Sequence, residues 1–351
     1  MNGNERMGQK HGILPQQAIS TLISRGAVTA ARGIGGDDGH PAQIQPASLD
    51  LRLGHVAYRL RASFLPGAGR RVSDDFDAVV MHKVDLTDGA VLETGCVYLV
   101  PLQEALALPA DLSAAANPKS STGRLDVFTR VITDGGKAFD AVPAGYSGPL
   151  YVEIAPRTFS ILVRPGDRLV QLRFRRGPLK ILKTQTVSID LAGLNDSSGI
   201  VGYRAKRHSG LVDVAHVGGH AARDFWEPIE GRGGSFILDP EEFYILASKE
   251  SVIIPEDMAA EMAPIAPEIG EFRAHYAGFF DPGFGVASVG GAGSRAVLEV
   301  RGRDVPFILR DGQPVAKLVF EAMSDQSDAL YGQNGSHYQA QGLRLSKHFK
   351  D

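Results

Sequence analysis

The chain has 351 residues, of which 43% are hydrophobic and 22% are charged, which is typical of a soluble globular protein long enough for two domains. A net charge of -3 argues against a broad nucleic-acid surface, and the single cysteine, Cys96, excludes an internal disulfide and a zinc site that needs two cysteines. No apolar run approaches the roughly 20 residues of a membrane span, and residues 1–16 lack a secretory core, so we expect a cytoplasmic protein whose partners include neither membranes nor nucleic acids.

Helical patterns are scarce in this sequence. Residues 15–25 are amphipathic and begin with a proline, which predicts a helix, and residues 255–262 predict a second, short one. Elsewhere glycine and proline separate short apolar runs, so we expect a mainly β protein of sandwich or barrel type with few short helices. The expected strands include residues 96–100, 150–154, 169–174, 243–246, 296–300 and 315–320.

Residues 118–124, with the sequence PKSSTGR, combine two cations, three hydroxyl groups and a glycine. Such a turn suits a polyphosphate, because cations, hydroxyls and backbone N–H groups all bind phosphate oxygens. A solvated loop leading into a strand has the same composition, so both interpretations remain open.

The second half contains three further polar features. Residues 277–285 (AGFFDPGFG) predict a turn around Asp281, whose carboxylate either bonds to its own backbone or faces a ligand. Glu299 shares one face of an apolar strand with Val297; it is either an exposed edge charge or a buried carboxyl with a raised pKa that can move a proton. Tyr331 and residues 337–342 form a polar tail that either covers a ligand or is disordered.

The two halves of the sequence repeat one pattern at a fixed offset. LALPADLSAAANP matches VIIPEDMAAEMAP, and RPGDRLVQLRF matches RDGQPVAKLVF. We therefore expect two copies of one β domain, at residues 1–180 and 181–351, joined near residues 176–230. The residues that recur 146 positions later are Leu92, Pro109, Asp111, Glu153, Gly166, Leu172 and Phe174.

Five segments resemble motifs of bacterial dCTP deaminases, in the same order along the chain. They are QPASLDLRLG at 45–54, KSSTGR at 119–124, AGFFDPGFG at 277–285, VLE at 297–299 and YQAQG at 338–342. The resemblance implies two tandem dUTPase-like domains of β-barrel or jelly-roll type, and hydrolytic deamination of dCTP to dUTP and ammonia. It also implies a homotrimer and inhibition by dTTP.

The resemblance assigns catalytic and phosphate-binding roles to individual residues. Glu299 would accept a proton from the water that attacks C4 of cytosine, while Ser120 and Arg124 would hold that water and the developing charge. Lys119, Ser120, Ser121 and Arg124 would bind the triphosphate. Mg²⁺ would arrive on that triphosphate, and no zinc is expected.

Four residues of the second half would bind the nucleoside, again by resemblance. Asp281 would bind the deoxyribose hydroxyl, and Val297 would lie against the edge of the base. Tyr331 and Gln341 would close over the nucleotide.

These motifs are divided between the two copies. At the repeat offset, Lys119–Ser121 correspond to residues 265–267 (IAP), so the second copy has no phosphate loop. Counting back from Glu153 by the spacing of the family reaches Pro143, so the first copy has lost the aspartate of the turn. We expect one composite site, with the loop of the first copy and the pocket and tail of the second.

The sequence departs from the family pattern at two places. Lys119 replaces an arginine, which removes a bidentate phosphate ligand. An insertion around residues 286–293 lengthens the separation between Asp281 and Glu299.

Three alternatives remain open. A dUTP pyrophosphatase, or a bifunctional enzyme that converts dCTP to dUMP, would share the fold and the phosphate loop, although this tail lacks the glycine-rich arm of typical dUTPases. A nucleotide-binding regulator with decayed sites would bind without turnover. Glu153 would be the catalytic group only if a pocket without the turn aspartate were functional.

Overall fold

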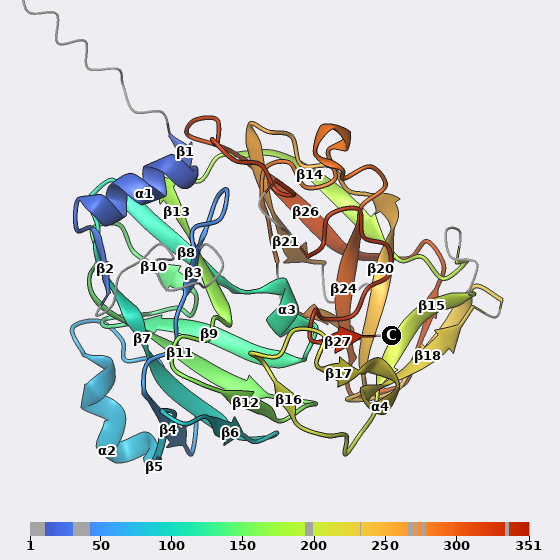
Figure 1. Cartoon of the computed structure of the whole chain (residues 1–351), viewed down its shortest axis with the longest axis horizontal. Helices are drawn as coiled ribbons and strands as arrows, with labels where there is room; N and C mark the ends of the chain where they lie inside the picture. Colours follow the sequence, from blue (N-terminus) through green and yellow to red (C-terminus); the bar gives the residue numbers. More distant parts are fainter. Residues whose placement is uncertain are drawn as a thin grey trace, which may run out of the picture.

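The computed structural model describes residues 11–30, 43–193, 199–231, 233–265, 270, 272–275, 278–333 and 337–350. The motif residues at 266, 267 and 277 lie outside these ranges, as do residues 1–10. The described chain is mainly β with few short helices, which confirms the expected fold class. In Figure 1 the N-terminal half (blue to green) and the C-terminal half (yellow to red) lie side by side.

Two sheets make up most of the first half. Its elements are β1 Gly12–Ile13, α1 Gln16–Ser24, β2 Val28–Ala30, β3 Leu49–Leu51, β4 Val56–Leu60, the 3-10 helix η1 Val72–Asp75, α2 Phe76–Val79, β5 Val80–Asp85, β6 Ala90–Leu92, β7 Val97–Ala107, β8 Leu112–Pro118, α3 Ser120–Gly123, β9 Val127–Thr133, β10 Ala141–Val142, β11 Ser147–Pro156, β12 Ile161–Val163 and β13 Val170–Arg176. One sheet has the order β1-β13-β8-β10, with β3 also on β13; the other has the order β5-β4-β7-β11-β9, with β2 also on β7.

The second half repeats this two-sheet arrangement. Its elements are β14 Ile181–Ser188, β15 Ile200–Ala205, β16 Val212–Asp213, β17 His220–Ala221, α4 Ala222–Phe225, β18 Trp226–Glu230, β19 Ser235–Leu238, β20 Phe243–Ser251, β21 Met258–Pro264, β22 Phe272–His275, β23 Phe279–Phe280, the 3-10 helix η3 Ala287–Val289, β24 Arg295–Gly302, β25 Phe307–Arg310, β26 Pro314–Ala322 and β27 Phe349–Lys350. One sheet has the order β14-β26-β21-β23, and the other has the order β18-β15-β20-β24-β22.

Strand register reproduces the repeat offset found in the sequence. Glu153 on β11 pairs with Leu99 on β7, and Glu299 on β24 pairs with Ile245 on β20. Both members of the second pair lie 146 positions after those of the first. The repeat is therefore structural as well as sequential.

One of the two expected helices is wrong. The helix expected at 15–25 is present as α1, whose Ile19 and Leu22 are buried; no helix within the described ranges is long and apolar enough to cross a membrane. The helix expected at 255–262 does not form, because β21 begins at Met258 and pairs with β26 on one side and β23 on the other. Hydrogen bonds to two neighbouring strands outweigh a short apolar pattern that also fits a helix.

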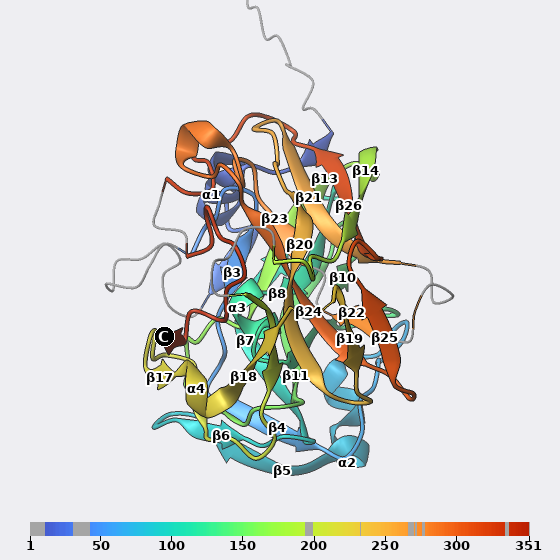
Figure 2. The ribbon, with the colours of Figure 1, turned by 90° about the vertical axis from the view of Figure 1, so that its right-hand side faces the viewer.

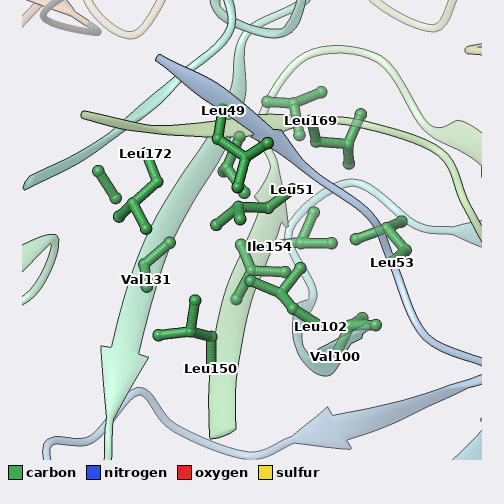
Figure 3. Packing of buried hydrophobic residues seen from close by; sticks show 14 of the residues in the cluster. Leu49, Leu51, Leu53, Val100, Leu102, Val131, Leu150, Ile154, Leu169 and Leu172 are labelled. Atoms are coloured by element: carbon green, nitrogen blue, oxygen red, sulfur yellow. The ribbon is translucent and has the colours of Figure 1, made fainter. Parts of the chain in front are cut away.

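Buried apolar side chains form two main clusters: one is centred on the first half but also includes Phe243, Ile245 and Val297, and the other lies within the second half. Figure 3 shows part of the first, in which Leu49, Leu51 and Leu172 approach Val131 and Ile154. The second cluster contains, among others, Tyr244, Leu246, Leu298, Val300 and Leu318.

The connection between the halves is more structured than the sequence indicates. The expected join at 176–230 contains β14, β15 and β18, which belong to the sheets of the second half. Part of this stretch also returns to the first half, because β16 pairs in parallel with β12 and Val212 and Trp226 join the first core.

The two halves meet through the sheets that contain β8 and β13 on one side and β21 and β26 on the other. Arg175 on β13 donates two hydrogen bonds to Glu321 on β26, at 2.8 and 2.9 Å. Asn117 Nδ2 donates to Glu261 Oε1 at 2.9 Å. Figure 2 shows α3 near the centre of the molecule and the C-terminal end of the chain at one side, beside β17.

Candidate active site

A pocket lies at the junction of the two halves, and every residue expected at the site lines it. These residues are Lys119, Ser120, Ser121, Arg124, Asp281, Val297, Glu299, Tyr331 and Gln341. The first four come from α3 and its flanks in the first half, and the others come from the second half. The loop and the pocket of the composite site thus meet within one chain.

The expected phosphate-binding residues lie on a single helical turn. Lys119 N and Thr122 Oγ1 donate to the carbonyl oxygen of Leu169, at 2.9 and 2.8 Å, which ties α3 to the segment before β13. The Lys119 ammonium pairs with Asp50, and Arg168 Nη1 lies 3.7 Å from the same carboxylate. Cations and hydroxyls therefore lie close together in the pocket lining, as a polyphosphate site requires.

Sequence reasoning missed part of the pocket lining. Asp50 lies inside the QPASLDLRLG motif and Tyr338 inside YQAQG, so both motifs carried a usable signal. His337 falls within the polar tail expected at residues 337–342, whereas Arg168 and Lys347 carry no signal in the sequence, because only the fold brings them to the pocket. Burial, reinforced by the charge of nearby Lys119, lowers the pKa of Lys347 to about 8.

Glu299 is a buried carboxyl on a central strand. β24 has β20 on one side and β22 on the other, so Glu299 is not an edge-strand charge in water. The side chain shares the pocket wall with Val297, as the alternation of a strand predicts. Burial raises the pKa of Glu299 to about 8, and the positive charge of Arg124 opposes this rise.

Arg124 connects the site to the C-terminal segment. Its Nη1 donates to the carbonyl oxygen of Arg344 and its Nη2 to Oε1 of Gln341, both at 3.0 Å. Its guanidinium lies 4.0 Å from the ring centre of Tyr338. Its Nε is 3.9 Å from Oε1 of Glu299 and has no hydrogen-bond partner among the described residues. One donor is thus available beside the carboxyl.

The turn that holds Asp281 requires glycine. Gly283 and Gly285 have φ values of 92° and 75°, where residues with a side chain are strained. A Cβ on Gly285 would lie 1.8 Å from the carbonyl oxygen of Val252. Asp281 Oδ1 accepts a hydrogen bond from Arg173 Nη2 at 2.9 Å; burial raises the pKa of Asp281, and Arg173 lowers it.

Strand register shows how this turn aligns between the copies. β10 pairs with β8 as β23 pairs with β21, with Ala141 and Phe279 at equivalent positions. Two residues beyond them lie Pro143 and Asp281, so the aspartate is absent from the first copy. The extra residues of the second copy lie between this turn and β24, where η3 forms.

The C-terminal segment, described from residue 337, folds against the pocket. Gln339 Nε2 donates to the carbonyl oxygen of Gly283 at 3.0 Å, and its Oε1 accepts from the N–H of Gly285 at 3.1 Å. Gln341 Nε2 donates to the carbonyl oxygen of Arg295 on β24 at 2.9 Å. The segment ends in β27, which pairs with β17. It is therefore fixed at both ends and contributes to the pocket wall.

Glu153, the counterpart of Glu299, lies in a different environment. It is 1% exposed, and its Oε1 accepts a hydrogen bond from Arg130 Nε at 3.0 Å. The Arg130 guanidinium also lies 3.7 Å from the ring centre of Phe139. Glu153 lines neither the composite pocket nor a second pocket in the second half. The geometry therefore favours Glu299 as the chemically active carboxyl.

The pocket combines an anion-binding end with a buried acid. Lys119, Arg168 and Lys347 supply positive charge, while Glu299 has a pKa raised to about 8 and lies beside a hydrogen-bond donor. Within the described residues, no group of three or more His, Cys, Asp or Glu side chains is placed to hold a metal ion. The arrangement suits proton transfer on a ligand that carries a polyphosphate.

Comparison with known proteins gives two domain matches. The profile of the "2'-deoxycytidine 5'-triphosphate deaminase (DCD) N-terminal domain" matches residues 10–178, and that of the corresponding C-terminal domain matches residues 167–349. A crystal structure of 2'-deoxycytidine 5'-triphosphate deaminase from Agrobacterium tumefaciens is 53% identical, with a TM-score of 0.86, and the match covers 93% of this chain and 99% of that one.

More distant relatives match over shorter stretches. The dCTP deaminase of Haloarcula marismortui is 32% identical over 134 residues, which are 38% of this chain and 66% of that protein. A dUMP-forming dCTP deaminase of Methanothermobacter thermautotrophicus is 29% identical over 164 residues, 46% of this chain and 78% of that protein. The match thus spans just under two thirds of the Haloarcula protein.

Proposed function

The chain belongs to the 2'-deoxycytidine 5'-triphosphate deaminase family, and on that premise we propose that it hydrolyses dCTP to dUTP and ammonia. The composite pocket carries the proposal, because it brings the cations Lys119, Arg168 and Lys347 together with buried Glu299, which lies beside Arg124. A nucleoside triphosphate matches both features, because its phosphates carry negative charge and its base carries the reacting amidine.

In the proposed reaction, Glu299 moves both protons of one water molecule. It takes the first proton as the water oxygen bonds to C4, and it delivers that proton to N3 of the ring. It then takes the proton of the new hydroxyl group and delivers it to the amino group, which leaves as ammonia while C4 becomes a carbonyl carbon. A carboxyl with a pKa of about 8 suits this work, because both its forms are populated near neutral pH.

Ser120 and Arg124 support this chemistry in the proposal. Both line the pocket with Glu299, and Arg124 Nε faces the carboxylate at 3.9 Å. Donors already in place beside a developing charge lower the barrier without reorganisation. We assign these two residues to holding the attacking water and stabilising the tetrahedral intermediate.

The phosphate end would bind the triphosphate with its Mg²⁺. Lys119, Ser120, Ser121 and Arg124 are the ligands expected from the sequence, and Arg168 and Lys347 add positive charge at the same pocket. Mg²⁺ would enter as part of the substrate, and zinc has no role in the proposal.

The nucleoside end would use four residues of the second half. Asp281 would accept a hydrogen bond from the deoxyribose hydroxyl, and Val297 would contact the edge of the base. Tyr331 and Gln341 would close the pocket over the nucleotide, which agrees with the C-terminal segment being bonded to β24 through Gln341.

A second candidate is a bifunctional enzyme that continues from dCTP to dUMP and pyrophosphate. The relatives support this second candidate, because proteins named "dCTP deaminase, dUMP-forming" match at 29% and 30% identity, close to the 32% of the Haloarcula deaminase. Both reactions need the same triphosphate end of the pocket. The released products distinguish them.

Three further expectations remain proposals: a homotrimer, inhibition by dTTP and a cytoplasmic location. All the residues expected at the site line one pocket within a single chain. The mass of the protein in solution would decide the oligomeric state, and titration of the reaction with dTTP would test inhibition.

The test of the function is to incubate the protein with dCTP and Mg²⁺ and follow ammonia, dUTP, dUMP and pyrophosphate. We expect equal amounts of ammonia and dUTP. Equal amounts of ammonia, dUMP and pyrophosphate would establish the bifunctional enzyme instead. Binding of dCTP without ammonia release would overturn deamination and favour a regulator. Chelation with EDTA followed by Mg²⁺ alone should restore the full rate.

A further inference from the structure

Arg173 belongs to the first half but makes its hydrogen bonds in the second. It lies on β13 and is 1% exposed. Its Nη1 donates to the carbonyl oxygen of Ala260 at 2.9 Å, and its Nη2 donates to that of Phe280 at 3.2 Å and to Oδ1 of Asp281 at 2.9 Å. The guanidinium also lies 4.1 Å from the ring centre of Phe279.

These contacts influence the ionisation of Asp281 and hold one of its carboxylate oxygens in place. Burial raises the pKa of the Asp281 carboxyl, and the charge and hydrogen bond of Arg173 lower it, so Arg173 favours the ionised form. Because Oδ1 is bonded to Arg173, a ligand hydroxyl would bind through Oδ2. The planar guanidinium also holds the turn itself, through the Phe280 carbonyl oxygen.

The pair forms only at the junction that builds the pocket. The repeat offset places Val319 at the position equivalent to Arg173, and strand register places Pro143 at the position equivalent to Asp281. The reciprocal pair of positions therefore holds Val319 and Pro143, with neither the arginine nor the aspartate. An arginine needed only to join the sheets would have no reason to accompany the aspartate in this way.

We propose that Arg173 is a positioning residue for the sugar, which holds the Asp281 carboxylate where it accepts a hydrogen bond from the 3'-hydroxyl of deoxyribose. The first half would thus supply part of the nucleoside subsite as well as the phosphate loop. This inference rests on the proposed function, because it takes the ligand to be a deoxycytidine nucleotide.

The test compares binding of dCTP with that of its 3'-deoxy analogue, 2',3'-dideoxycytidine triphosphate. Turnover is stopped with Glu299→Gln, and Arg173→Met or Arg173→Lys is added to that background. In Glu299→Gln alone, dCTP should bind at least about tenfold more tightly than the analogue, because a hydrogen bond to a charged group contributes this much to binding. Arg173→Met should abolish the preference, and Arg173→Lys should keep part of it, since it retains the charge but not the planar fork.

Arg175→Met is the matched control. Arg175 lies on the same strand and crosses the same junction, but its partner there is Glu321, which does not line the pocket, whereas the partner of Arg173 is Asp281, which does. Arg175→Met should leave the preference for dCTP over the analogue unchanged. If Arg173→Met and Arg175→Met weaken both nucleotides equally and keep the preference, Arg173 only joins the halves and the proposal is overturned.

A double variant covers the case in which Arg173→Met does not fold. Arg173→Met with Asp281→Asn removes both charges, so no buried carboxylate is left unpaired. The double variant should bind dCTP as Asp281→Asn alone does, because Arg173 acts through Asp281. If the double variant bound dCTP more than about threefold more weakly than Asp281→Asn, the result would contradict the proposal. These measurements do not depend on turnover, so absent deamination in the unmodified chain would refute the function separately.

Discussion

Nε of Arg124, in the first half, lies 3.9 Å from Oε1 of Glu299, in the second half, and both side chains are buried. The other two guanidinium nitrogens bond to the C-terminal segment, through Gln341 and the Arg344 carbonyl oxygen. Arg124 thus links the loop, the buried carboxyl and the tail. This linkage makes each of the three dependent on the others.

Glu299→Gln should lower kcat by about 10²–10⁴-fold, the usual contribution of a positioned acid or base. The amide cannot take a proton from water, whereas its size leaves the pocket intact. Ammonia release from dCTP measures the loss. Glu153→Gln is the control, since Glu153 is bonded to Arg130 outside the pocket, and it should retain most of the activity. The reverse result would move the active carboxyl to the first copy.

The rate should rise with pH toward about 8. Glu299 acts first as a base, and its pKa of about 8 means that the ionised form grows about tenfold per pH unit below that value. We therefore expect kcat/KM for dCTP to increase between pH 6 and 8. A flat profile over this range would mean that the ionisation of Glu299 does not control the reaction.

Above pH 8 we expect kcat/KM to fall, because Lys347, with its pKa lowered to about 8, loses its charge. Lys347→Arg keeps the charge and should move this decline to higher pH. Lys347→Met should raise KM for dCTP by about tenfold and leave dCMP binding nearly unchanged, since a lost contact to outer phosphates costs dCMP little. Equal losses for both nucleotides would argue against a phosphate contact.

The stability of the protein should also depend on Glu299. Its pKa is raised from 4.5 to about 8 on folding, so its contribution to stability is complete below pH 4.5 and is lost as the pH rises through 8. The amide of Glu299→Gln does not ionise, so this variant loses no stability as the pH rises through 8. The difference in unfolding free energy in favour of the variant should therefore grow with pH, by at most about 1.4 kcal/mol per unit between these values. Urea unfolding at pH 5, 7 and 9 measures it, and a constant difference would contradict the burial effect.

Because the expected residues of the loop and of the pocket meet in one chain, two defective chains should not rescue each other. Ser120→Ala removes a residue of the loop, and Glu299→Gln removes one of the pocket. Co-expressed and purified together, the two variants should show no more than the sum of their separate activities. Recovery of activity would mean that the loop and the pocket come from neighbouring chains. Arg175→Met mixed with Glu299→Gln provides the control for assembly.

Much of the fold and site follows from the sequence because the relevant signals are local. Short apolar runs between glycines and prolines predict strands. Residues that recur at one offset, as Glu153 and Glu299 do, indicate a duplicated domain. The motif resemblance likewise depends on residues that are adjacent in the chain. These signals identify the β class, the repeat and the division of the motifs between the copies.

Tertiary structure alone decided the rest, because those features depend on contacts between distant positions. Residues from 258 onward form a strand, since β23 and β26 bond to both its edges, although their local pattern also suits a helix. Lys347 and Arg173 carry no motif; the first reaches the pocket with the folded tail, and the second reaches Asp281 across the junction. The sequence predicts a composite site, but only the packing of the two halves brings Arg124 to Glu299 within a single chain.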